Sequence, residues 1–133
     1  MRLAVVGAHL AGQPLHHQLS DRAAVLVAVT RTAPAYRLWD LGTTPAKPGL
    51  VRDPDAGAAI VVEVWDLGGE AFAGFVDALA TPMAIGHVEL GDGSWVNGFL
   101  VEPYALTGAT EITEYGGWAA YLAGRAVSQS AKV

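Results

Sequence analysis

The chain has 133 residues, of which 52% are hydrophobic and 16% are charged, so it can bury one domain's core and is not intrinsically disordered. It contains no cysteine, which excludes disulfide bonds, thiolate zinc sites and iron–sulfur clusters. No apolar run reaches the roughly 18 residues of a membrane span. The first residues also lack the pattern of a signal peptide, so we expect a cytoplasmic protein without membrane contacts.

The net charge of −5 argues against nucleic acid as a partner, because nucleic acids bind basic surfaces. The charges are unevenly distributed. Every charged residue from Asp53 to Gly124 is acidic, whereas a short stretch before it carries Arg31, Arg37, Lys47 and Arg52. This separation favours a small anion as the ligand of the basic stretch. The alternative is that these cations are solvated or pair with the acids downstream.

In the first half of the chain, the apolar run at residues 3–8 is typical of a buried strand, and residues 10–19 have the spacing of a short helix. The Val-rich residues 24–31 and the alternating residues 36–41 predict two further strands. Residues 42–57 contain several Pro and Gly residues, so we expect a long connection or an irregular hairpin there.

In the second half, residues 58–66 have the clearest strand pattern, and residues 69–79 place apolar side chains on one face of a helix. Strands at 83–90 and 94–101 are separated by Gly-Asp-Gly, a good hairpin signal. A last short helix is expected at 115–123.

Together these elements predict an α+β domain with a curled, mixed β-sheet flanked by short helices, because strands outnumber helices and a regular βαβ repeat is missing. We expect the domain to cover residues 1–124 and a polar tail to cover residues 125–133.

The first candidate site follows the first strand. Gly7 allows the backbone to turn or to approach a ligand closely, and His9 stands near a strand end, where site residues are common. We expect the main pocket to be lined by Gly7, Ala8, His9, Leu10 and Gln13. A lone histidine is equally compatible with a structural role.

The remaining histidines are His16, His17 and His87, and none has the spacing of a helical metal site. The sequence therefore predicts neither a metal ion nor a cofactor.

A second group of candidates could hold an anion. Arg31 ends a predicted strand, and a turn at the following Pro could bring Tyr36 and Arg37 back towards it, so that two guanidinium groups clamp a dicarboxylate. Glu63 lies inside a predicted strand, on the solvent face or buried with a partner such as Arg31. Gly117 lies at the start of the last helix, whose N-terminus would attract anions, although two glycines there are also typical of a tight entry turn.

Several blocks of the sequence resemble the C-terminal domain of allophanate hydrolase. They include AVVGAHLAGQPL at residues 4–15, TRTAPAYRL at 30–38 and PGLVR at 48–52, with later blocks such as VEVW at 62–65 and YGGW at 115–118. The resemblance covers nearly the whole chain. It implies a γ-glutamylcyclotransferase-like fold, in which a small, barrel-like mixed sheet is closed or nearly closed and is flanked by helices.

The resemblance also implies a function in urea or allophanate nitrogen metabolism. In that family the domain is associated with decarboxylation of N-carboxycarbamate to ammonia and carbon dioxide, and the histidine implicated there corresponds best to His9. The amidase part of the family is absent from this sequence, so a separate amidase chain is the expected partner. The ligand would be a small dicarboxylate or carbamate.

Two other functions are compatible with the resemblance. The chain could be a non-catalytic anion-binding or assembly module for an amidase, and a homodimer would fit that role. It could also be a γ-glutamylcyclotransferase, which needs a carboxylate such as Glu63 or Glu89 in the pocket. The sequence departs from true cyclotransferases, because residues 75–82 offer no Glu after the helix, and from the family block, which usually has Asn where His16 stands.

Overall fold

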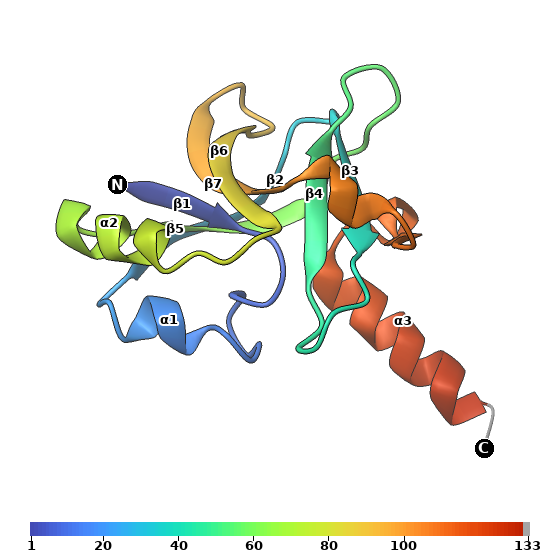
Figure 1. Cartoon of the computed structure of the whole chain (residues 1–133). Coiled ribbons are helices and arrows are strands. Elements are labelled where there is room, and N and C mark those ends of the chain that lie inside the picture. Colours follow the sequence, from blue (N-terminus) through green and yellow to red (C-terminus); the bar gives the residue numbers. More distant parts are fainter. Residues whose placement is uncertain (132–133) are drawn as a thin grey trace.

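The computed structural model describes residues 1–131, which form two β-sheets with helices packed beside them (Figure 1). Lys132 and Val133, the end of the expected tail, lie outside the described residues. None of the helices within residues 1–131 is both long enough and apolar enough to cross a membrane.

The larger sheet has five strands in the order β2 (Val25–Arg31), β5 (Val61–Asp66), β1 (Arg2–Val5), β7 (Trp95–Val101) and β6 (Met83–Glu89). The pair β1 and β7 is parallel, and the other neighbouring pairs are antiparallel. The sheet is therefore mixed, with β1 at its centre. This is the mixed sheet that the sequence predicts.

The smaller sheet has three antiparallel strands in the order β4 (Pro48–Arg52), β3 (Tyr36–Asp40) and β8 (Thr110–Glu111). For the segment at 42–57, which contains Pro and Gly, the sequence leaves a long connection or an irregular hairpin open. The structure has the hairpin, because β4 lies within this segment and pairs along the whole of β3.

Three α-helices complete the fold: α1 (His17–Ser20), α2 (Gly69–Asp77) and α3 (Trp118–Ala131). Two short 3-10 helices, η1 (Pro103–Leu106) and η2 (Thr113–Tyr115), flank β8. Figure 1 shows α1 and α2 near the larger sheet, whereas α3 extends away from the body of the molecule.

The expectation of an α+β fold is confirmed, but the larger sheet is not a closed barrel. It curls until the ends of its edge strands meet, where Thr32 bridges Leu90 and the N–H of Gly91 donates to the carbonyl of Arg31 (3.0 Å). No continuous ladder joins β2 to β6 within residues 1–131. The strand β3 lies outside this sheet and pairs with β4 and β8 in the smaller one.

The prediction of a helix at residues 10–19 is wrong over most of that range. Gly12 has a φ of +83°, which a right-handed helix cannot accommodate, and the N–H of Leu15 donates back to the carbonyl of Ala8 (2.9 Å). These contacts fold the segment into successive turns, and α1 is confined to four residues. The last helix is longer than expected, because α3 continues to Ala131.

The close approach of the two sheets depends on Gly7, which follows β1. A Cβ at this position would overlap the ring of Pro48, the first residue of β4. A glycine is therefore required where the chain leaves the central strand and passes the smaller sheet.

We expect Gly7→Ala to lower the free energy of unfolding by about 1–3 kcal/mol, because the added methyl group overpacks this contact. The control is Gly74→Ala in α2, where a Cβ meets no atom within 4 Å and should raise stability by about 0.5–1 kcal/mol. Urea unfolding of both variants tests this expectation, and equal stability of Gly7→Ala and wild type would contradict it.

Candidate functional site

His9 lies on the turn after β1 and is held by aromatic rings from two other elements. Its ring stacks on Phe99 of β7, with centroids 4.9 Å apart and planes at 9°. Phe75 of α2 approaches at 5.3 Å in a tilted orientation. Because β1 runs parallel to β7 at the centre of the sheet, the end of β1 delivers the imidazole onto Phe99.

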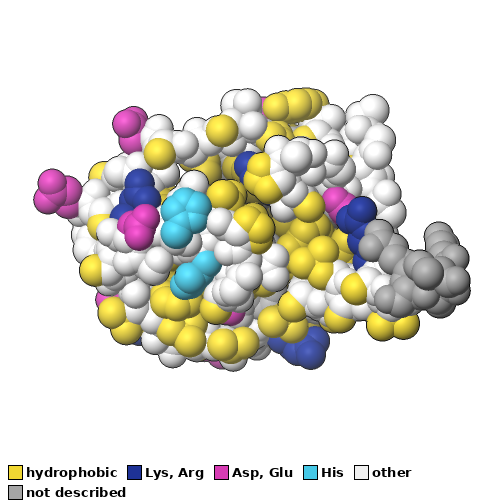
Figure 2. Space-filling model, turned by 90° about the horizontal axis from the view of Figure 1, so that it is seen from below, with side chains coloured by type: hydrophobic (Ala, Val, Ile, Leu, Met, Phe, Trp, Pro, Cys, Tyr) yellow, Lys and Arg dark blue, Asp and Glu magenta, His cyan; other side chains and the backbone are white. Residues whose placement is uncertain are grey.

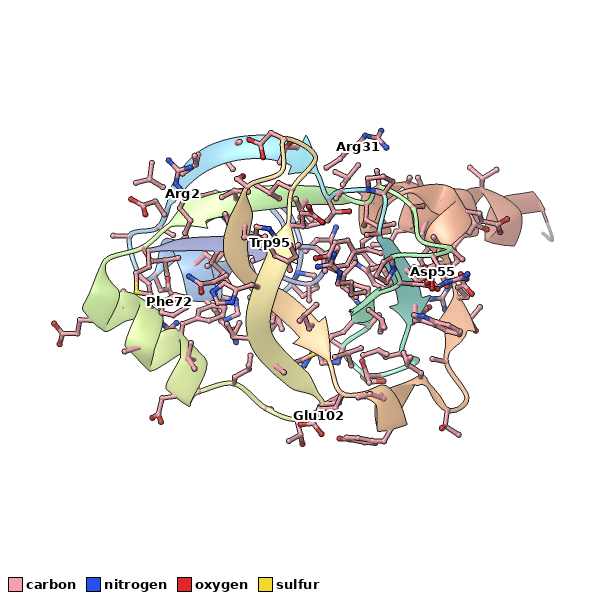
Figure 3. The ribbon with its side chains drawn as sticks, turned by 90° about the horizontal axis from the view of Figure 1, so that it is seen from above. Arg2, Arg31, Asp55, Phe72, Trp95 and Glu102 are labelled. Atoms are coloured by element: carbon pink, nitrogen blue, oxygen red, sulfur yellow. The ribbon has the colours of Figure 1, made fainter. Side chains whose placement is uncertain are left out.

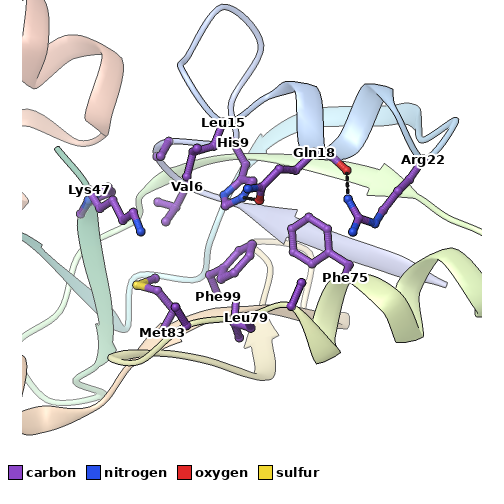
Figure 4. A pocket seen from close by; sticks show the side chains of 15 residues that line it. Val6, His9, Leu15, Gln18, Arg22, Lys47, Phe75, Leu79, Met83 and Phe99 are labelled. Atoms are coloured by element: carbon purple, nitrogen blue, oxygen red, sulfur yellow. Dashed lines mark hydrogen bonds between the residues drawn. The ribbon is translucent and has the colours of Figure 1, made fainter. Parts of the chain in front are cut away.

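A cavity of about 170 Å³ opens beside this ring (Figure 4). It lies between the turn after β1, the α1 segment, the end of α2 and the start of β4. Its lining is Val6, Gly7, Ala8, His9, Leu15, Gln18, Arg22, Lys47, Pro48, Phe75, Ala78, Leu79, Ala80, Met83 and Phe99. No Asp or Glu is among these residues, so His9, Arg22 and Lys47 are the titratable groups of the lining.

Two basic side chains flank His9. Arg22 lies over the ring of Phe75 at 5.5 Å, and its Nη1 donates to the carbonyl of Gln18 (2.9 Å). Lys47 lies on the opposite side of His9 in Figure 4. Neither cation forms an ion pair within the part of the chain that the structure describes. Their positive charge is therefore available to an anion in the cavity.

Burial among the aromatic rings lowers the pKa of His9 below its usual value of about 6.5. The hydrogen bond between Nε2 of His9 and Oε1 of Gln18 (2.7 Å) opposes this shift, and the charge of Lys47 adds to it. These surroundings thus favour a neutral imidazole at neutral pH.

The first group of predicted site residues is only partly brought together. Gly7, Ala8 and His9 line this cavity, as the sequence predicts. Leu10 points instead into a second cavity of about 260 Å³, and Gln13 lines neither. The turns that replace the expected helix direct the side chains of Leu10 and Gln13 away from the cavity beside His9.

The predicted arginine clamp is not formed. Arg37 pairs with Asp53 (2.6 Å) and with Glu111 (2.8 Å), outside the cavity, and this pairing lowers the pKa of Asp53. Arg31 points outward from the end of β2 (Figure 3) and lines the second cavity together with Gly117. The turn between the two arginines therefore does not bring their guanidinium groups to one ligand.

Tyr36 and Glu63 have structural contacts. Tyr36 is fully buried, and its hydroxyl accepts a hydrogen bond from the N–H of Glu89 (2.8 Å). Glu63 accepts hydrogen bonds from the N–H of Ala11 (2.9 Å) and from Nε1 of Trp65 (3.1 Å), rather than pairing with Arg31. Glu63 thereby fastens the turns after His9 to the larger sheet.

The face seen from below carries exposed histidine side chains next to a hydrophobic area, and its basic side chains stand apart from one another (Figure 2). His17 and His87 are exposed, whereas His16 is half-buried against Trp65. No group of three or more metal-ligating His, Cys, Asp or Glu side chains occurs within the described residues.

The sequence analysis does not identify Gln18 and Arg22, nor the rings of Phe75 and Phe99, as neighbours of His9. Lys47 was recognised only as one member of a basic stretch. The positions of these residues depend on the turns at 7–16 and on the β3–β4 hairpin, so spacing along the sequence contains little information about them.

Comparison with known proteins shows which protein family the chain is related to. The sequence pattern of the family described as allophanate hydrolase C-terminal domain matches residues 1–123. The chain belongs to this family. Among curated proteins it is 42% identical over 126 residues to urea amidolyase of Saccharomyces cerevisiae, covering 91% of this chain and 7% of that protein. It is 39% identical to urea amidolyase of Lachancea kluyveri, so the chain spans less than a tenth of the length of these relatives.

Solved structures of the same family have the same fold. The allophanate hydrolase of Kluyveromyces lactis superposes with a TM-score of 0.89 at 39% identity, over 92% of this chain and 21% of that one. An E. coli protein described as c4763, specific to uropathogenic strains, superposes with a TM-score of 0.85 at 34% identity and is covered to 94%. The domain therefore occurs both inside long chains and in a chain of its own size.

The lowered pKa of His9 predicts a specific pH dependence of stability. Because the folded state binds this proton less well than the unfolded state, stability should fall as the pH decreases from about 6.5 through the pKa of the folded protein. His9→Asn should remove this component, whereas His17→Asn, at an exposed position, should retain it. Urea unfolding at several pH values measures the difference, and identical profiles for wild type and His9→Asn would contradict the expectation.

Proposed function

We propose that this chain decarboxylates N-carboxycarbamate to ammonia and carbon dioxide, acting after a separate amidase in the breakdown of urea or allophanate. The observation that carries the proposal is the cavity beside His9, where an imidazole stands between two unpaired cations and no carboxylate lines the wall. Membership of the allophanate hydrolase C-terminal domain family supports the choice of substrate.

The charge of the cavity suits a small dianion. Arg22 and Lys47 lie on opposite sides of His9, so positive charge reaches the imidazole from both directions and would attract a small dianion to it. The cavity, of about 170 Å³, has room for a small molecule of several heavy atoms. N-carboxycarbamate is such a molecule, because a single N–H joins its two carboxylates.

Binding of a dianion would also charge the histidine. The lowered pKa favours a neutral His9, and a nearby negative charge raises the pKa of an imidazole. The substrate would therefore draw a proton onto His9 as it binds. His9 then holds an acidic proton in the enzyme–substrate complex, when the reaction requires it.

In the chemical step the imidazolium transfers its proton to the substrate nitrogen. The bond between this nitrogen and one carboxylate carbon then breaks, its electron pair stays on nitrogen, and carbon dioxide leaves. The remaining carbamate takes up a second proton on nitrogen and releases ammonia and the second carbon dioxide. His9 regains its proton from solvent, and Arg22 and Lys47 hold the carboxylates during proton transfer.

A separate amidase would supply the substrate, since N-carboxycarbamate forms when an amidase removes ammonia from allophanate. This part of the proposal rests on the relatives, in which the domain is one part of much longer allophanate hydrolase and urea amidolyase chains. A cyclotransferase function has less support, because Glu63 bonds to Ala11 and Trp65, and Glu89 contacts Arg52 at 3.4 Å, away from the cavity.

Malonate, a stable analogue of the dianion, tests the binding site. We expect Lys47→Met and Arg22→Met each to weaken malonate binding by roughly 10–100-fold, because each removes a charge-assisted hydrogen bond. Arg37→Met is the matched control and should leave the affinity unchanged, since Arg37 pairs with Asp53 and Glu111 outside the cavity. Calorimetry in buffers of different ionisation enthalpy should also detect proton uptake on binding. Loss of binding in Arg37→Met alone would contradict this site.

Carbon dioxide release from freshly generated N-carboxycarbamate tests catalysis. In a stopped-flow assay the wild-type chain should exceed the uncatalysed rate, and His9→Asn should reduce the enzymatic rate about 10²–10⁴-fold, the usual cost of a lost general acid. His17→Asn should behave like wild type. A wild-type rate equal to the background, together with tight malonate binding, would replace the enzyme by a non-catalytic anion-binding module.

A further inference from the structure

His9 is fixed at three points, two on its imidazole ring and one on its backbone. Its ring lies flat against Phe99, its backbone carbonyl lies 2.9 Å from Nδ1 of His16, and its Nε2 lies 2.7 Å from Oε1 of Gln18. Rotation of the ring about its side-chain bonds would break both the stacking contact and the bond to Gln18. The two ring nitrogens therefore have different surroundings.

An amide oxygen only accepts hydrogen bonds, so Nε2 of His9 must carry the hydrogen in this contact. In the neutral ring the other nitrogen, Nδ1, is then unprotonated, and it has no hydrogen-bond partner within the described residues. We propose that Gln18 is a positioning residue that fixes His9 in the Nε2–H tautomer, so that Nδ1 is the atom that takes up and delivers the proton. The catalytic part of this proposal rests on the proposed function.

Gln18 positions a second group of the cavity through its backbone. Its carbonyl accepts the hydrogen bond from Arg22, whose guanidinium lies over Phe75. One residue of the four-residue helix α1 thus orients both the imidazole and one of the cations beside it.

A neutral amide differs here from a carboxylate. The ionisable groups around His9 are Lys47 before β4, His16 and His17 at α1, and Arg22 after α1, and no Asp or Glu lines the cavity. A carboxylate at position 18 would raise the pKa of His9 and favour the imidazolium form even without an anionic ligand. Glutamine selects the tautomer without adding charge, so the protonation of His9 is left to respond to the ligand.

Nitrogen-15 NMR of the histidine rings in the full chain tests the assignment directly. In wild type above the pKa of His9, Nε2 should carry the hydrogen and Nδ1 should have the shift of an unprotonated nitrogen. Gln18→Leu should abolish this preference and lower the pKa of His9 further, whereas Gln18→Glu should raise that pKa. The matched control, Gln13→Leu, changes a glutamine outside both cavities and should leave the His9 signals unchanged.

The kinetic readout separates positioning from general structural damage. Gln18→Leu should reduce kcat at least 10-fold with a smaller change in KM, and Gln18→Glu should shift the pH profile of kcat to higher pH. A wild-type His9 with its hydrogen on Nδ1, or a Gln18→Leu spectrum identical to wild type, would overturn the proposal. If the tautomer is as expected but no enzymatic decarboxylation occurs, the proposed function fails and Gln18 still orients a ligand-binding histidine.

Discussion

The stacking of His9 on Phe99 is the contact on which the rest of the site depends. It follows from the parallel pairing of β1 with β7, which brings the end of the central strand over that ring. The same contact removes the imidazole from water and lowers its pKa. Burial thus favours the neutral form of His9, and an anion nearby would favour its protonation.

The distribution of charge complements this arrangement. The chain is acidic overall, yet the wall of the cavity carries Arg22 and Lys47 and no carboxylate. Three of the chain's carboxylates have partners elsewhere: Glu63 fastens the turns after β1 to the larger sheet, and Asp53 and Glu111 pair with Arg37. The attraction between the cavity and a dianion is therefore not reduced by a neighbouring acid.

Much of the strand content could be predicted from the sequence, because apolar runs and the Gly-Asp-Gly hairpin are local signals. The turns between residues 10 and 16 could not be predicted. The apolar spacing there is typical of a helix, but the positive φ of Gly12 and the hydrogen bond from the N–H of Leu15 to the carbonyl of Ala8 form turns instead. The position of His9 in the lining of the cavity could be predicted from its place after Gly7. Arg37 was misassigned because a salt bridge to Glu111 joins residues far apart in the sequence. The role of Gln18 depends on ring geometry, which no sequence pattern describes.

A crystal structure of the chain with bound malonate would test the central claim most directly. The account predicts malonate in the cavity beside Phe99, with a carboxylate oxygen within hydrogen-bond distance of Lys47 or Arg22 and with Nδ1 of His9 facing the ligand. Malonate bound only in the second cavity, next to Arg31 and Gly117, would contradict it, as would an unoccupied His9 cavity at a malonate concentration that saturates the protein in solution.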